Sequence, residues 1–192
     1  MGLDYAYKLY FPRRCVLDAL QGLAEMCIPG KTMGIICFPQ GVRKVPFEPF
    51  ADNPVPKWDD ASYSFEIILN LEADEALERF TCKDPAALTT GDDSLNLGYI
   101  YFRVDNGAGQ DVSKFVFIAL GNRMSWAFMD SRSLRRIFIC LLAAHEGICG
   151  LLDMDEWQEV FWWRGKETWA RLEGAWSLED IAKQISFKLP LR

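Results

Sequence analysis

Long apolar runs are absent from the sequence. None of its 192 residues falls in a stretch of about 18 uninterrupted apolar residues, so no membrane-spanning helix is expected. The first residues have neither a basic start nor an apolar run before a small-residue cleavage site, so no secretory signal is expected. The six cysteines form no C-x-x-C pair and mostly lie among apolar residues, which indicates reduced, buried thiols. These features predict a cytoplasmic location and no membrane partner.

Motifs for phosphate and metal binding are also missing. There is no G-x-G-x-x-G and no G-x-x-x-x-G-K-[ST] pattern, so no nucleotide site is predicted. His145 is the only histidine, and Cys149 stands where H-E-x-x-H requires a second one. A zinc site or a thiol–imidazole pair of His145 with Cys149 would have to span Gly147, which is expected to end the helix. We therefore predict no cofactor, no metal and no catalytic residues.

The balance of charge is acidic, with 27 Asp and Glu against 21 Lys and Arg and a net charge of −6. An acidic chain repels phosphate backbones at long range, so nucleic acid is not an expected partner. The same charge suits a basic protein partner, although it also serves solubility.

The chain is organised around the stretch Gly98–Gly121. Two apolar runs, Tyr99–Val104 and Phe115–Leu120, flank a polar segment that contains Asn106-Gly107. Aromatic and β-branched residues dominate both runs, which predicts a strand pair. Because neither run alternates cleanly, we expect the pair at the centre of a sheet, covered on both faces.

Further elements surround this pair. Period-two or short apolar runs predict strands at 3–11, 33–38, 42–47, 63–71, 148–152 and 159–164. Helical spacing and caps predict helices after Pro12, after Asp74, after Asp130 and after Ser177, and a helical turn at 166–173. The prediction is a single α+β domain over 1–192, with two layers: a mostly antiparallel sheet of about six to eight strands and about three main helices on one face.

Tryptophan is concentrated near the C-terminus, where five of the seven occur, at positions 157, 162, 163, 169 and 176. Trp162 and Trp163 are adjacent on a predicted strand and must point to opposite faces. Either residues 166–176 fold back and bury these rings in a second small core, or Trp162, Trp163, Arg164 and Trp169 form a recognition surface. Tryptophan and arginine are enriched at binding hot spots.

A second, weaker candidate lies at the start of the helix after Asp130. Amide groups at a helix N-terminus and nearby guanidinium groups hold anions. The residues are Ser131, Arg132, Ser133, Arg135 and Arg136. The alternative is an ordinary solvated helix face with capping serines.

These observations favour a non-enzymatic protein-binding domain. Its partner would be another protein, basic by charge complementarity, or a second copy, and an inhibitor or immunity-type protein is one form of this function. The alternative is a small-molecule binder with an apolar pocket between sheet and helices. Its lining would be Tyr99, Tyr101, Phe115, Phe117 and Trp126. An enzyme that uses Asp, Glu, Cys or Tyr without histidine is the third.

Overall fold

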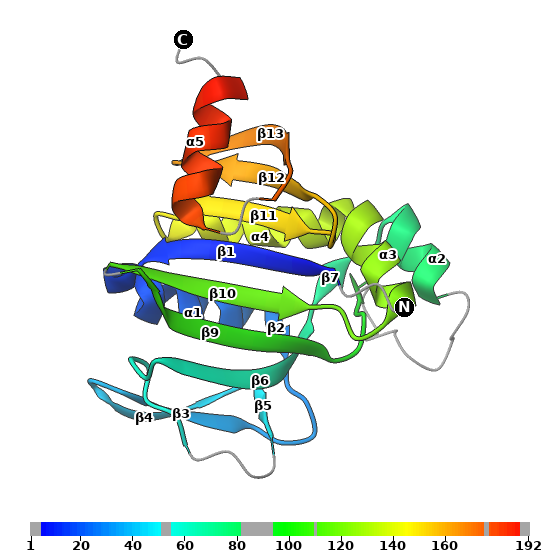
Figure 1. Ribbon diagram of the computed structural model, residues 1–192. Helices are drawn as coiled ribbons and strands as arrows, with labels where there is room; N and C mark the ends of the chain where they lie inside the picture. Colours follow the sequence, from blue (N-terminus) through cyan, green and yellow to red (C-terminus); the bar gives the residue numbers. More distant parts are fainter. Residues whose placement is uncertain (1–4, 51–54, 82–93, 110, 175–176, 189–192) are drawn as a thin grey trace.

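The computed structural model describes residues 5–50, 55–81, 94–109, 111–174 and 177–188 (Figure 1). A nine-stranded antiparallel sheet runs through it in the order β13-β12-β11-β1-β10-β9-β6-β2, with β5 also paired to β6. Its strands are β1 (Ala6–Pro12), β2 (Cys27–Ile28), β5 (Glu48–Pro49), β6 (Ser62–Leu69), β9 (Ile100–Gly109), β10 (Val112–Ile118), β11 (Cys149–Asp153), β12 (Gln158–Trp163) and β13 (Lys166–Leu172). The α+β class and the antiparallel sheet are confirmed, and the expected strand pair is β9–β10, inside the sheet.

Two small strand pairs and five α-helices complete the described part of the chain. The pairs are β3 (Gly34–Phe38) with β4 (Gly41–Val45), and β7 (Leu71–Glu72) with β8 (Ser94–Leu95). The helices are α1 (Val16–Glu25), which follows the short 3₁₀ turn Arg13–Cys15, α2 (Glu75–Thr81), α3 (Asn122–Asp130), α4 (Arg132–Ala144) and α5 (Leu178–Lys188). The element counts therefore exceed those expected from the sequence.

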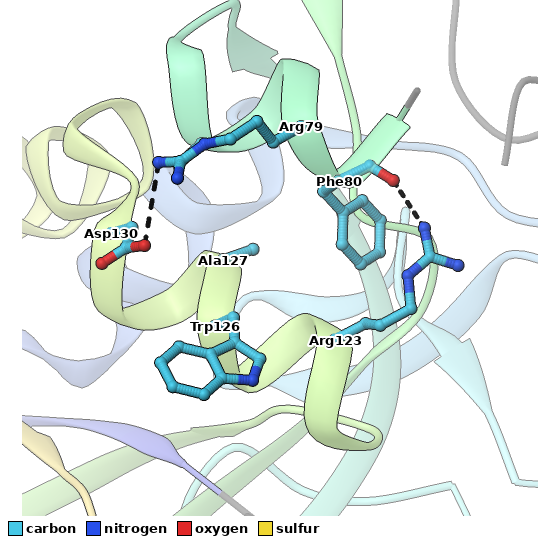
Figure 2. A pocket seen from close by; sticks show the side chains of 7 residues that line it. Arg79, Phe80, Arg123, Trp126, Ala127 and Asp130 are labelled. Carbon is cyan, nitrogen blue, oxygen red and sulfur yellow. Dashed lines mark hydrogen bonds and ion pairs between the residues drawn. The ribbon is translucent and has the colours of Figure 1, made fainter. Parts of the chain in front are cut away.

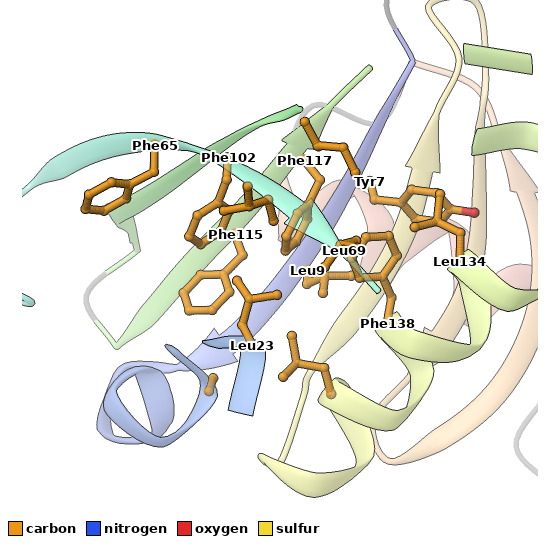
Figure 3. Packing of buried hydrophobic residues seen from close by; sticks show 14 of the residues in the cluster. Tyr7, Leu9, Leu23, Phe65, Leu69, Phe102, Phe115, Phe117, Leu134 and Phe138 are labelled. Atoms are coloured by element: carbon orange, nitrogen blue, oxygen red, sulfur yellow. The ribbon is translucent and has the colours of Figure 1, made fainter. Parts of the chain in front are cut away.

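One face of the sheet carries the main core, in which aromatic rings predominate (Figure 3). Phe102 stacks on Phe117 with ring centroids 4.9 Å apart, and Phe117 meets Phe138 of α4 at 4.6 Å. Tyr7 is fully buried beside Phe138, and its hydroxyl donates to the Phe128 carbonyl at 2.8 Å. Helices α1, α3 and α4 and the β3–β4 hairpin contribute residues to this core.

Among the described residues, a helix packs on the opposite face over β11–β13, where α5 lies (Figure 1). Ile181 and Ile185 of α5 are buried against Leu151, Val160 and Leu172. The expectation of helices on a single face is therefore wrong. The reason is that β11 and β12 carry apolar side chains on both faces, so their second face also needs a cover.

Over β9 and β10 this face carries both apolar and charged side chains, with Tyr101, Val116 and Ile118 beside a cluster of ionised groups. Asp105 accepts a hydrogen bond from Ser62 at 2.8 Å and lies 3.1 Å from Arg103 Nε and 3.3 Å from Lys114 Nζ. Burial opposes ionisation of Asp105, but the Ser62 hydroxyl and the two cations outweigh it and hold the pKa of that carboxyl below its usual range. The central strand pair is thus covered by apolar contacts on one face and carries this ion cluster among apolar side chains on the other.

Two segments differ from the predicted secondary structure. Residues 166–173 were expected to form a helical turn, but Lys166–Leu172 is strand β13. The two-residue turn Arg164-Gly165, with φ of 48° and 83°, reverses the chain and pairs β13 with β12. Helix α3 was not predicted at all. The sequence also favoured a loop over residues 82–96. Its part from 82 to 93 lies outside the described residues, as does Trp176, whereas Ser94–Leu95 forms strand β8.

Candidate functional site

The structure separates the four residues of the predicted tryptophan surface. Trp162 is buried, and its indole N–H donates to the Gly147 carbonyl at 2.8 Å. Trp163 is half-buried against the α5 cluster, with the Arg164 guanidinium 5.3 Å from its ring centre. Trp169 is 65% exposed. The sequence left a buried mini-core and a recognition surface as alternatives, and only Trp169 fits the second.

Trp169 is exposed because of its place on β13, the last strand of the sheet. Alternate residues of a strand point to opposite faces. Ala170 and Leu172 are buried under α5, whereas Glu167, Trp169 and Arg171 share the other face and are exposed. Helix α4 packs on β1, β11 and β12 but leaves the Trp169 ring in solvent.

A cavity of about 520 Å³ lies between α4 and β13. It is lined by Met129, Asp130, Ser131, Arg132, Arg135, Arg136, Ile139 and Glu167. We call the exposed cavity residues Arg132, Arg136 and Glu167, the half-buried Ile139, and the neighbouring exposed β13 residues Trp169 and Arg171 together the β13–α4 surface. The guanidinium of Arg171 lies 4.0 Å from the centre of the Trp157 ring, which holds it on this side of β13.

The arginines of the predicted anion site take different roles. Arg135 is half-buried and ion-pairs with Glu159 at 2.6 Å. It lies next to Tyr7, and burial, partly offset by this arginine, raises the pKa of Tyr7 to about 12. Arg136 lies 3.5 Å from Glu72 with both side chains in solvent, where such a pair contributes little. Arg132 is exposed at the mouth of the cavity.

An internal carboxylate occupies the N-terminus of α4, where the sequence left a bound anion and capping serines as alternatives, and Ser131 does cap this helix by accepting from the Leu134 amide. Asp74 Oδ2 accepts from the Ser133 amide at 2.9 Å and from the Ser131 hydroxyl at 2.8 Å. Its other oxygen accepts from the Leu77 amide of α2 at 2.9 Å. Partial burial opposes ionisation, but these hydrogen bonds outweigh it and hold the pKa of Asp74 below its usual range. Asp74 thus caps two helices, and the amide of Ser133 is already paired.

His145 and Cys149 lie on different sides of the sheet. Cys149 is buried in the α5 cluster, where burial raises the pKa of its thiol, so it stays protonated. The His145 ring lies against Gly22 of α1, so close that any side chain at position 22 would clash with the ring. Within the described part of the chain, no three His, Cys, Asp or Glu side chains are grouped as a metal site requires.

The five aromatic residues expected to line one pocket do not come together. Phe115 and Phe117 fill the main core, and the Tyr99 hydroxyl donates to Glu48 at 2.6 Å. Trp126 is 52% exposed on α3, beside a cavity of about 230 Å³ with Phe80 and Arg123 (Figure 2). The space between sheet and helices is therefore occupied by aromatic side chains.

Tyr101 alone of the five lines a larger cavity, of about 470 Å³, at the β5–β6 end of the sheet. Its walls are Met33, Ile35, Pro49, Phe50, Val55, Pro56, Asp60, Ser62, Tyr63, Ser64, Phe65, Tyr101 and Arg103. The Phe50 and Tyr101 rings lie 5.6 Å apart. The mixture of apolar walls and a few polar groups is typical of small-molecule sites.

Comparison of the chain with protein-family models, with curated proteins and with solved structures gave no match. No helix in the described ranges has the length and apolar character needed to cross a bilayer. The residues of the site must therefore carry the functional argument alone.

The sequence reasoning missed Glu167, Arg171 and Ile139. A signal for the first two was present. Arg164-Gly165 separates two runs of β-forming residues, and two-residue connections ending in glycine are typical of hairpins. Assigning a strand after this turn would have placed Glu167, Trp169 and Arg171 on one face. Ile139 could be assigned to this surface only from the way α4 packs on the sheet, and no local sequence pattern predicts that packing.

Proposed function

We propose that this protein is a protein-binding module that recognises its partner through the β13–α4 surface. The observation that carries the proposal is the 65% exposure of Trp169 on an edge strand. A large aromatic ring in solvent, with Arg171 on the same face of the strand, has the composition of a binding hot spot. An edge strand adds unpaired backbone groups, which a partner strand can use.

The local charge of this surface differs from that of the whole chain. Arg132, Arg136 and Arg171 stand against Glu167, whereas the chain carries a net charge of −6. The net charge favours a basic partner at long range, but the contact itself favours a partner that brings carboxylates to the arginines. The proposal commits to such a carboxylate-bearing protein surface.

Native mass spectrometry of the protein, purified gently from its own source, tests this function. We expect a protein-sized additional mass that is lost in Trp169→Ala, with affinity at least about tenfold weaker. Trp126→Ala is the matched control, since Trp126 is also half-exposed but lies on α3. Equal losses in both variants, or a complex unaffected by Trp169→Ala, would contradict the proposal.

The cavity at the β5–β6 end supports a second candidate function, the binding of a small molecule. It combines an aromatic wall with Arg103 and the hydroxyls of Ser62 and Ser64. We expect a retained adduct of a few hundred daltons in native spectra, as a drug-sized ligand in such a pocket would give, and its loss in Tyr101→Ala. A spectrum without any adduct, from protein never exposed to harsh washing, would count against this candidate.

A further inference from the structure

We propose that the partner of the β13–α4 surface is a second copy of this chain, joined by antiparallel pairing of β13 with the β13 of that copy about a two-fold axis at Trp169. This inference rests on the proposed function, because it names the partner of the same site. It draws on three observations: the backbone of β13, the order of its charges, and the form of the two ends of the sheet.

The backbone of β13 is suited to further pairing. In the described residues β13 pairs only with β12, so one edge is open. Trp163 and Lys166 flank the two-residue turn and face each other across the hairpin. The β12–β13 ladder shifts register between Val160 and Trp162, but the side chains of β13 keep alternating between the two faces. Alternate residues of a strand direct both backbone groups to the same side, so Lys166, Thr168 and Ala170 point toward β12. Glu167, Trp169 and Arg171 then direct their N–H and C=O groups outward.

The charges on β13 select one register. With the axis at Trp169, Glu167 of each copy lies opposite Arg171 of the other. The dimer then has two equivalent Glu167–Arg171 pairs. If the axis moves by two residues to Glu167, the two Glu167 side chains face each other. If it moves by two residues to Arg171, the two Arg171 side chains face each other. Opposite charges across strands stabilise pairing and like charges oppose it. Charged residues usually protect an edge strand from association, but in this order they favour a single arrangement.

The exposed side chains fit the same register. Glu167, Trp169 and Arg171 lie on one face of β13, away from α5. The two Trp169 rings would meet at the axis, and aromatic pairs across strands are favourable. Glu167 of each copy then places a carboxylate opposite Arg171 of the other copy.

The two ends of the sheet explain why pairing would stop at two copies. At the far end, the outer edge of β6 is already paired with β2 and β5, which are two residues each. Among the described strands of the nine-stranded sheet, β13 is the one with a long open edge, while β4 of the separate β3–β4 pair is the other strand of more than two residues that has a partner on one side alone. A two-fold contact consumes that edge in both copies, so the assembly closes as a dimer.

Charge reversal and charge swap, measured by sedimentation over a concentration series, test the inference. We expect a concentration-dependent dimer for the wild type. Glu167→Arg places like charges at both pairs and should weaken it by about tenfold or more, which corresponds to about 1.4 kcal/mol. The double variant Glu167→Arg with Arg171→Glu restores both pairs and should return the affinity to within about threefold of the wild type. Trp126→Ala should leave it unchanged, and circular dichroism confirms folding of each variant.

The outcomes separate this inference from the proposed function. A wild type that stays monomeric at about 200 µM, well above the range of specific homodimers, overturns the inference. If it still forms a Trp169-dependent complex with another protein, the proposed function stands. A dimer that is insensitive to Glu167→Arg, or a swap that fails to restore a weakened dimer, also overturns the proposed register. A dimer insensitive to both Trp169→Ala and Glu167→Arg is not formed through this surface at all.

Discussion

Trp162 and Trp169 lie seven residues apart, yet one is held by the fold and the other faces solvent. In Trp162→Phe the Gly147 carbonyl loses its indole donor and the core loses volume. We expect the free energy of unfolding to fall by about 1–3 kcal/mol in urea denaturation. Trp169→Ala should change it by less than about 0.5 kcal/mol, as exposed positions generally do. Similar losses in both variants would contradict the division between a structural and a binding tryptophan.

Asp74 makes stability depend on pH. Its pKa is lower in the folded protein than in the unfolded chain, so its ionised form stabilises the fold above about pH 4, and this contribution is lost as pH falls through the folded pKa. Asp74→Asn keeps one acceptor but loses the charge. We expect a loss of about 1–2 kcal/mol at pH 7, as for other helix caps, and a gap between the two stability curves that narrows toward pH 2. A gap of constant size at every pH would contradict this.

Asp74 also shows how far single residues can be read from the sequence. Its capping of α2 was predicted, since Asp before a helical run is a local signal, and the bond to Leu77 confirms it. Its second bond, to Ser131, spans 57 positions. No local sequence pattern spans that separation, so the sequence could not show that the Asp74 carboxylate reaches the start of α4.

Elements with strong local signals were predicted well, and those placed by their neighbours were not. The capping bond of Ser177 to the Asp180 amide starts α5 as predicted, and Ile181 and Ile185 are buried. The face on which α5 packs depends on the pairing of β11, β12 and β13, which the sequence did not give. Residues 166–173 were misread because the two-residue turn at Arg164-Gly165 was not recognised as the connection of a hairpin.

The docking of α5 gives a prediction at the scale of the element. Ile181→Ala with Ile185→Ala removes most of its buried contact with the sheet. Each buried Ile→Ala costs about 2–5 kcal/mol, so we expect the double variant to lose at least about 3 kcal/mol of unfolding free energy. Hydrogen exchange should speed up in α5 and β13 more than in β1 and β10. Lys183→Ala, an exposed position on the same helix, is the control. Exchange that accelerates evenly over all strands would show that α5 is not a separate layer.

Over the whole molecule, the covering of the sheet is uneven. One face is closed by the aromatic core, while the other carries α5 at one end and the Asp105 ion cluster in the middle. The open edge strand β13 is covered by α5 on one face, where Ala170 and Leu172 are buried, and its other face is exposed. An edge strand that is packed on one face can add a strand without rearranging the rest of the sheet.

Hydrogen exchange measured at two protein concentrations tests both the order of stability within the sheet and the proposed dimer contact. At about 1 µM, the inner strands β1 and β10 should exchange slowest, because both their edges are paired within the sheet and buried contacts are densest there. At about 100 µM, where a dimer of ordinary affinity is populated, the amides of Glu167, Trp169 and Arg171 should gain protection while those of Thr168 and Ala170 change little. The reason is that only the first three point away from β12 and would bond to the second copy. Glu167→Arg should abolish the gain. Protection that rises instead at β2 and β5 would place the contact at the other end of the sheet.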